Sequence, residues 1–420
     1  MNIKNNEYVV AVITKILMVI LGLAESVLLA RYLGAELRGQ VSYINSITQT
    51  GYIIATFGIY AAYPYFRKQL DVNKILNRTM SVTFVMLCFY VIVSVIAALF
   101  LRNNKEWFYI VTLVPILFYD KVISFIWMIE EPNKRNIVLL FASVAKLLYF
   151  AALYLKAPQN LFWGVTTLAI APLLESIYFT VTLKFKFSLK DCLPKSFWPL
   201  LSYGFLPMIA VLLTTLNYRI DVIMLRRYST ISLADIGVYS IGITLAEKVL
   251  LVSDAVKEIL LSKLAKGKGK QEVAKVMRIC FLISIVMAIG VSIISKEFIN
   301  LLYGAEYHGA ERVTNISVWG TIFMVFFRMI SQYNVANHKQ KYNIIFLGVA
   351  ILLNIVMNFI FIPVLGINGS ALATALGYGF SSLVFIIYFQ RLSGISYRDL
   401  TIINKNDIIQ LKKIVKTISQ

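Results

Sequence analysis

The sequence predicts an all-α, polytopic membrane protein with about twelve transmembrane helices. A dozen apolar stretches follow one another from Tyr8 to Phe389, and each has the roughly 20 residues that a helix needs to cross a ~30 Å hydrocarbon core. Hydrophobic residues make up 59% of the chain and its mean hydropathy is +0.75, far above the composition of a soluble domain. The connectors between the stretches are short, so we expect no extramembrane domain.

Six of these stretches lie in the first half of the chain, each bounded by polar or charged positions. The first is preceded only by Lys4 and has no small-residue cleavage site after it. We therefore expect a retained helix rather than a removed signal peptide. The six predicted spans are residues 8–30, 39–63, 80–101, 107–129, 137–155 and 161–183.

The second half contributes six further stretches and a basic tail. Pro207 lies inside the seventh stretch and predicts a kink there. In the tail, apolar residues at helical spacing between Asp407 and Ile418 predict an amphipathic helix on the inner leaflet, although a tail without a role fits nearly as well. The six predicted spans are residues 200–225, 236–259, 279–295, 315–337, 342–363 and 367–389.

The distribution of basic residues orients the chain. Of its 41 Lys and Arg residues, 25 lie at the two termini or in the connectors on the same side as the termini. Because basic connectors stay on the cytoplasmic side, we expect both termini in the cytoplasm. The net charge of +20 follows from these connectors and their contact with anionic lipid head groups, so we expect membrane lipids and no nucleic acid as partners.

Cysteine and histidine are too sparse for a metal or disulfide site. Cys88 and Cys280 lie in or beside apolar stretches, and Cys192 lies in a connector. His308 and His338 fall on opposite sides of the predicted membrane. These positions do not form a disulfide framework or a metal cluster, and we expect no metal and no cofactor.

The two halves of the chain resemble each other. Glu25 and Arg31-Tyr32 recur as Asp221 and Arg227-Tyr228, both at an offset of 196 residues. A second match has an offset of 207 residues throughout: Lys121, Ile123, Ser124, Lys134, Asn136 and Ile137 recur as Arg328, Ile330, Ser331, Lys341, Asn343 and Ile344. We interpret this as a duplication that gives two six-helix bundles, residues 1–190 and 191–390, followed by the tail, residues 391–420. Six spans per half give both halves the same orientation, related by a pseudo-twofold axis along the membrane normal, which is a transport architecture.

Ionisable residues within the spans indicate the site, because each costs ~3 kcal/mol or more at the bilayer centre. Lys121 and Arg328 are equivalent in the repeat, so we expect one cation on each wall of a cavity between the halves. Arginine offers phosphate a planar fork of donors, which favours a diphosphate or an anionic sugar as the ligand. The candidate ligands are Arg328, Lys121, Lys146, Lys15, Arg219 and Lys248. The candidates for binding a coupling proton or sodium ion are Glu25, Asp221, Asp120, Glu175 and Glu247.

Ion pairing inside the bundles is the alternative role for these charges. We favour it for Asp254, Lys257 and Glu258, which are spaced i, i+3 and i+4. For Glu25 with Arg31, and for Asp221 with Arg219, the pairing and coupling roles are equally well supported.

Several motifs resemble the polysaccharide-repeat flippases that move O-antigen or capsule units, within the multidrug/oligosaccharidyl-lipid/polysaccharide exporter superfamily. They occur in the family's order along nearly the whole chain: Arg31-Tyr32-Leu33-Gly34 with Gly39, Asn217 to Leu225, Gly237-Val238-Tyr239-Ser240 with Ala246-Glu247-Lys248, Leu302-Tyr303-Gly304 with Tyr307, Asn354 to Asn358 with Ile362-Pro363, and Gly366 to Ala371. The chain departs from the family's pattern at Ala35 and at Leu37-Arg38, in a connector.

The resemblance implies two six-helix bundles in a V shape, in the bacterial inner membrane. It also implies ion-coupled, antiporter-like alternating access that passes an undecaprenyl-diphosphate-linked oligosaccharide, of lipopolysaccharide O-antigen or capsule, from the cytoplasmic to the periplasmic leaflet. A polysaccharide polymerase complex is an implied partner. The alternatives are an exporter of drugs or of another lipid-linked precursor in the same superfamily. A membrane glycosyltransferase or polymerase is less expected, since the long loops such enzymes use are missing. We therefore expect a transporter and not an enzyme.

Overall fold

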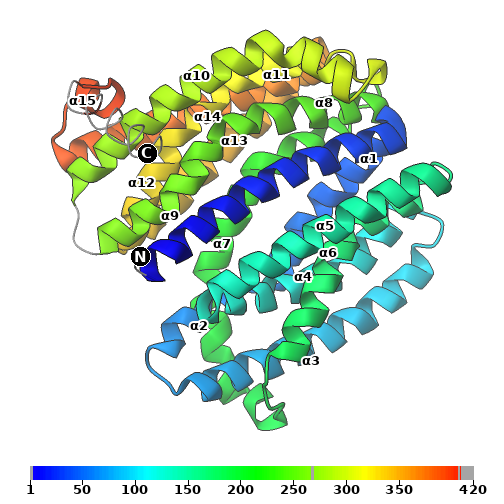
Figure 1. Cartoon of the computed structure of the whole chain (residues 1–420), viewed down its shortest axis with the longest axis vertical. Helices are drawn as coiled ribbons and strands as arrows, with labels where there is room; N and C mark the ends of the chain where they lie inside the picture. Colours follow the sequence, from blue (N-terminus) through cyan, green and yellow to red (C-terminus); the bar gives the residue numbers. More distant parts are fainter. Residues whose placement is uncertain (1–2, 266–268, 405–406, 408–420) are drawn as a thin grey trace. The chain divides into compact units, whose positions relative to one another are not determined.

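The computed structural model describes the backbone of residues 3–265, 269–404 and 407, and the side chains from residue 17 onward except those of residues 258, 262 and 265. This part of the chain consists of helices, short turns and no strand (Figure 1). The α-helices are α1 (Ile3–Ala55), α2 (Ile59–Arg67), α3 (Val72–Phe100), α4 (Lys105–Glu130), α5 (Pro132–Lys156), α6 (Leu161–Thr182), α7 (Pro194–Leu225), α8 (Leu233–Ala246), α9 (Leu251–Ala265), α10 (Lys270–Leu302), α11 (Ala310–Thr321), α12 (Met324–Ala336), α13 (Gln340–Leu365), α14 (Ile367–Ser393) and α15 (Tyr397–Thr401). Three 3-10 turns lie between them: η1 (Leu189–Cys192), η2 (Glu247–Leu250) and η3 (Ala305–Tyr307).

The helices reproduce the predicted spans. Among the described residues, ten helical segments are long and apolar enough to cross a membrane, and the pair α11 and α12, bent by 41° at its break, forms an eleventh. Helix α1 contains the predicted span 8–30 and most of the predicted span 39–63, separated by a kink at Gly34, and the end of the second span continues into α2. These candidates therefore account for all twelve predicted stretches, and the predicted fold class is confirmed.

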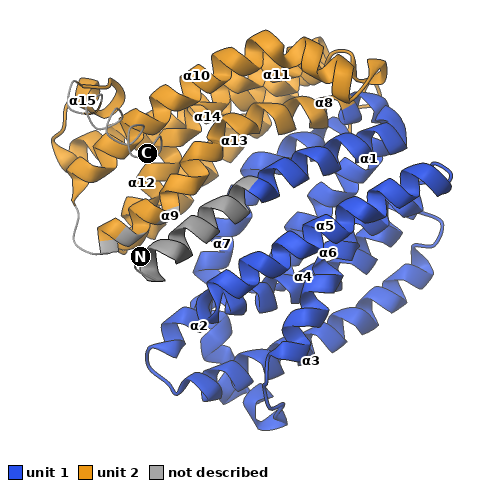
Figure 2. Cartoon of the chain, viewed as in Figure 1, with its two compact units in different colours: residues 1–226, 232–237 blue, residues 227–231, 238–420 orange. Residues whose placement is uncertain are grey.

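The chain forms two compact units (Figure 2). Unit 1 comprises Met1–Arg226 and Ser232–Gly237, and unit 2 comprises Arg227–Ile231 and Val238–Gln420. Helix α7, which the sequence analysis placed in the second half, packs against α1 and α2 within unit 1. The division into two equal six-helix bundles stays a prediction.

Unit 1 has two apolar cores. One lies among α2, α3 and α4, where Tyr63, Phe118 and Ile123 are fully buried. The other lies among α1, α4, α5 and α6 and includes Ile44 and Phe150. Helix starts are set by polar caps that satisfy otherwise unpaired backbone N–H groups: Asp71 accepts from Lys74 N at 3.0 Å, Asn104 from Trp107 N at 3.3 Å and Asn160 from Phe162 N at 3.0 Å.

Glycines permit two close backbone approaches in unit 1. Gly58 has a φ of +70° at the N-cap of α2, and its backbone lies against that of Gly204 in α7. Gly39 in α1 meets the first turn of α8 at Leu233 and Gly237. A side chain at any of these glycines would overlap a neighbouring backbone, so the crossings require residues without a Cβ.

Unit 2 is held by polar contacts between α13 and α14 as well as by aromatic packing. Ser370 donates to Asn358 Oδ1 at 2.7 Å, and Asn358 Nδ2 donates to Asn354 Oδ1 at 2.9 Å. All three side chains are buried, so the hydrogen bonds offset their desolvation. The motif that runs from Asn354 to Ser370 therefore joins two helices.

The start of the tail is anchored to unit 2. Asp407 accepts from Arg278 Nε at 2.7 Å, and the same guanidinium contacts the carbonyl oxygen of Asp399. Burial alone would raise the pKa of Asp407, but hydrogen bonds from Arg278 and the backbone of Asn404 keep this pKa below its usual value. Residues 408–420, which hold most of the predicted amphipathic helix, lie outside the described residues.

Candidate functional site

The spans of unit 1 enclose a set of charged residues that we name the N-terminal charge cluster: Glu25, Asp120, Lys121, Arg135, Lys146 and Glu175. One end of the cluster is an ion pair between α1 and α5, in which Lys146 Nζ lies 3.0 Å from Glu25 Oε2. Only 13% of the Glu25 side chain and 23% of the Lys146 side chain are exposed. The structure thus pairs a candidate coupling acid with a candidate ligand cation. Pairing of Glu25 with Arg31 was one of two equally supported roles, and Lys146 was not considered as its partner.

Two carboxyl groups meet at the centre of this cluster. Asp120 from α4 and Glu175 from α6 are within hydrogen-bonding reach of each other. A carboxylate has no hydrogen to donate, so a hydrogen bond between the two requires one shared proton. Asp120 Oδ1 is buried and has no hydrogen-bond partner among the described residues. The pair therefore has the chemistry to take up and release one cation, either a proton or a metal ion of single charge.

Cations of the cluster surround this carboxyl pair. Arg135 and Lys121 lie near Asp120, while Arg135 and Lys146 lie near Glu175. Lys121 Nζ also lies 5.2 Å from the ring centroid of Tyr60, a favourable cation–π distance. The acids and bases of the cluster thus come from α1, α4, α5 and α6, and they influence one another's charge.

Arg135 was not among the predicted site residues, because its position in the sequence is that of a basic connector residue. In the structure, Arg135 lies in the first turn of α5, and its Nε donates to Ser124 Oγ of α4 at 2.9 Å. Its position in the first turn of a helix, four residues after Glu131, was the available signal. A count of the basic residues in the connectors does not reveal that one of them belongs to the charge cluster.

A second set, the C-terminal charge cluster, lies in unit 2 and consists of Asp254, Lys257 and Arg328. Lys257 Nζ donates to Asp254 Oδ1 at 2.8 Å, as the i, i+3 spacing predicted. Arg328 from α12 forms an ion pair with the same carboxylate. Lys257 and Arg328 therefore contact the same carboxylate. The side chain of Glu258, the third residue of the predicted trio, lies outside the described residues.

Arg328 is the most enclosed member of the C-terminal charge cluster. Its side chain is 12% exposed, compared with 32% for Asp254 and 35% for Lys257. An arginine can pair with one carboxylate and still present other N–H donors to a ligand, because its guanidinium carries five of them. The predicted role of Arg328 in anion binding is compatible with this geometry.

The structure separates the remaining predicted residues. Arg219 Nε donates to Gln49 Oε1 at 3.2 Å, across α7 and α1 in unit 1, and Gln49 was not identified from the sequence. Asp221 is buried in α7. Glu247 and Lys248 lie together in η2 of unit 2, and the side chain of Lys15 lies outside the described residues. Among the residues that the structure describes, no group of three His, Cys, Asp or Glu side chains is arranged to hold a metal ion.

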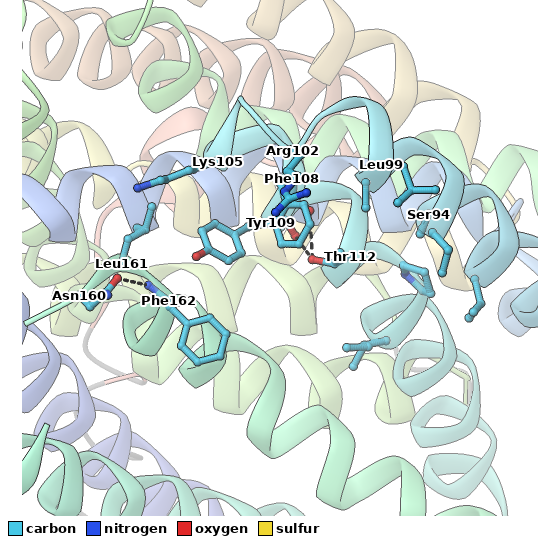
Figure 3. Close-up of a pocket in the computed structure, with 15 residues that line it drawn as sticks. Ser94, Leu99, Arg102, Lys105, Phe108, Tyr109, Thr112, Asn160, Leu161 and Phe162 are labelled. Carbon is cyan, nitrogen blue, oxygen red and sulfur yellow. Dashed lines mark hydrogen bonds between the residues drawn. The ribbon is translucent and has the colours of Figure 1, made fainter. Parts of the chain in front are cut away.

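A pocket of about 770 Å³ lies elsewhere in unit 1, between α3, α4 and the start of α6 (Figure 3). None of the charged residues predicted from the sequence lines it. Its volume is within the ~300–1,000 Å³ usual for small-ligand sites. The pocket is therefore distinct from both charge clusters.

Comparison with known proteins identifies the family. The sequence profile of the polysaccharide biosynthesis protein family matches residues 7–252, and the MatE profile matches residues 207–360. One curated relative is the lipid II flippase MurJ of Bacillus subtilis (strain 168), 29% identical over 132 residues. That alignment covers 30% of this chain and spans only 24% of the relative's length.

Solved structures share the fold. The inward closed conformation of the lipid II flippase MurJ has a TM-score of 0.70 and 17% identity, covering 98% of this chain and 92% of that one. An inward-facing multidrug resistance transporter of the MATE family, in the MOP superfamily, has a TM-score of 0.70 and 11% identity, covering 92% of this chain and 98% of that one. The resemblance seen in the sequence is thus confirmed: the chain shares the fold of these transporters and belongs to the polysaccharide biosynthesis protein family.

Proposed function

We propose that the protein is a flippase for an undecaprenyl-diphosphate-linked oligosaccharide repeat unit, of O-antigen or capsule type. It moves this substrate from the cytoplasmic to the periplasmic leaflet of the bacterial inner membrane, with both termini in the cytoplasm. The observation that carries the proposal is Arg328, whose side chain lies within a candidate span and is only 12% exposed. An arginine at such a depth is costly, and charged side chains within spans mark the path of a ligand or an ion. Membership of the polysaccharide biosynthesis protein family favours a glycan-linked anion.

We assign the diphosphate or anionic sugar to Arg328 first, supported by Lys121, Lys248, Arg219 and Lys15. Lys146 is a weaker ligand candidate because Glu25 neutralises it at 3.0 Å. A diphosphate has more oxygens than one lysine can engage, and the arginine fork matches two of them at once.

We assign ion coupling to the carboxyl pair Asp120 and Glu175. The pair can exchange one proton or one sodium ion, and the three cations around it make its charge sensitive to any rearrangement of α1, α4, α5 and α6. Glu25, Asp221 and Glu247 remain further candidates. A polysaccharide polymerase complex is the proposed partner that consumes the flipped unit.

The proposed function predicts where the substrate accumulates in a deletion strain. Without the protein, surface polysaccharide should be lost, and the complete lipid-linked repeat unit should build up in the inner membrane. An impermeant glycan-modifying reagent added to intact spheroplasts should not reach the accumulated units, whereas inverted vesicles should expose them. Reaction of these units from the outside of spheroplasts would contradict the proposal.

A lipid II flippase is the second candidate, because the curated relative over 132 residues carries that name. It makes a different prediction from the first: expression of this chain should then restore growth when the host's own lipid II flippase is depleted. Failure to restore growth, together with loss of surface polysaccharide in the deletion strain, would favour the first candidate.

A further inference from the structure

The pocket between α3, α4 and α6 opens onto apolar surface. Helix α3 is the most apolar and the least buried of the candidate spans in the described part of the chain. Leu99 is 73% exposed and Phe100 is 84% exposed. Side chains of this kind on a spanning helix face lipid tails, because no water is available there to solvate a polar alternative. A molecule that enters this pocket therefore comes from the hydrocarbon of the membrane.

The interior of the pocket offers little to a polar ligand. Ser94 Oγ donates to the carbonyl of Val111 at 2.7 Å, and Thr112 Oγ1 donates to the carbonyl of Phe108 at 3.1 Å. Asn160 Oδ1 already accepts from the backbone N–H of Phe162. Figure 3 shows these side chains together with the apolar Leu99, Leu161 and Phe162. The hydroxyls of Ser94 and Thr112 are thus bonded to backbone, and Tyr109 supplies the remaining hydroxyl of the lining. Such a mostly apolar interior suits an apolar chain.

Two cations lie at one end of the pocket. Arg102 follows α3, and Lys105 begins α4; both line the pocket and both are exposed. Neither forms an ion pair or hydrogen bond within the described part of the chain, while the adjacent Glu106 is taken by Arg226 at 3.2 Å. Trp107, 41% exposed, lies two residues further on, and tryptophan at a span end marks the level of the lipid head groups. The two cations therefore lie where a lipid phosphate would be.

We infer that this pocket binds an anionic phospholipid, with one acyl chain between α3, α4 and α6 and the phosphate at Arg102 and Lys105. The charge at the rim, the apolar interior and the lipid-facing helix each match one part of such a molecule. The site lies outside both charge clusters, and the inference does not rest on the proposed transport function.

Native mass spectrometry of the full chain in detergent tests this site, with phosphatidylglycerol and phosphatidylcholine of identical acyl chains as probes. We expect phosphatidylglycerol to be retained preferentially. The double variant Arg102→Ala/Lys105→Ala should weaken its retention by about tenfold or more, because each basic residue near the surface contributes to attraction of an anionic head group. Its control, Arg227→Ala/Lys296→Ala, removes two exposed cations that do not line the pocket and should retain phosphatidylglycerol as the wild type does.

A second pair of variants tests the apolar part. Val95 lines the pocket and Ile96 does not, although both are exposed on α3. Val95→Trp should reduce retention of both lipids, whereas Ile96→Trp should leave it unchanged. Equal retention of the two lipids by the wild type, or full retention by the Arg102→Ala/Lys105→Ala variant, would overturn the inference. Displacement of phosphatidylglycerol by equimolar undecaprenyl phosphate would overturn the phospholipid assignment in favour of this carrier lipid. Displacement by inorganic phosphate would show that the pocket does not hold the acyl chain.

Discussion

Replacing Arg328 with alanine is expected to reduce surface polysaccharide by roughly tenfold or more, because the bidentate anion ligand is lost from the C-terminal charge cluster. Arg328→Lys should retain part of the polymer, since the charge remains and the planar fork does not. The measurement is the amount of surface polysaccharide per unit of protein in the membrane, compared with the wild type.

The ion pair with Asp254 provides the control for this result. If Arg328 only neutralises Asp254, the single variant leaves this partly buried carboxylate with Lys257 as its one remaining cation in the C-terminal charge cluster, which lowers the stability of the protein. The double variant Arg328→Ala/Asp254→Asn removes both charges and should then recover protein level and polymer together. We expect it to recover the protein level alone. Normal polymer from the double variant would remove Arg328 from the binding site.

Neutralising Asp120 or Glu175 is expected to abolish the dependence of transport on the ion gradient. Asp120→Asn or Glu175→Gln leaves one acid next to a neutral amide that can donate a hydrogen bond to it. This contact favours the ionised carboxylate, so the remaining acid takes up a proton less readily. In vesicles with an imposed proton or sodium gradient, the transport rate of the wild type should rise with the gradient. The transport rate of the variant should stay at the value measured without a gradient. Binding of the lipid diphosphate should persist, because the residues that we propose as its ligands are unchanged.

Glu25→Gln and Asp221→Asn are the comparison variants for this experiment. Glu25 is paired with Lys146, so its neutralisation frees a cation without touching the carboxyl pair. Full gradient dependence in both comparison variants, together with its loss in Asp120→Asn, would assign coupling to Asp120 and Glu175. Gradient dependence retained in Asp120→Asn and Glu175→Gln but lost in Glu25→Gln would instead assign coupling to the Glu25 and Lys146 pair.

The spans were predictable because the hydrocarbon core imposes one length and one composition on every crossing helix. The breaks within these spans were less predictable. Gly34 kinks α1 without ending the helical pattern, and α11 and α12 are bent between Thr321 and Met324 without a proline. Apolar periodicity is the same on either side of such breaks, so it does not reveal them.

The site was predictable only where contacts are local. The Asp254 and Lys257 pair followed from i, i+3 spacing, because helix geometry alone brings these side chains together. The Glu25 and Lys146 pair joins residues from α1 and α5, and Asp120 and Glu175 join α4 and α6. Depth in the membrane identified all four residues as unusual, but which helices are neighbours depends on tertiary packing that a single sequence does not encode in any short pattern.

The most direct test of the proposed function is translocation by the purified protein in liposomes. A short undecaprenyl-diphosphate-linked oligosaccharide from the host would be placed in one leaflet, and an impermeant glycan-modifying enzyme would measure its arrival in the other. We expect arrival that requires the protein, accelerates with an ion gradient and is lost in Arg328→Ala. No translocation by the folded wild-type protein would contradict the proposal of an anion-binding flippase. Undiminished translocation by the Arg328→Ala variant would contradict it as well.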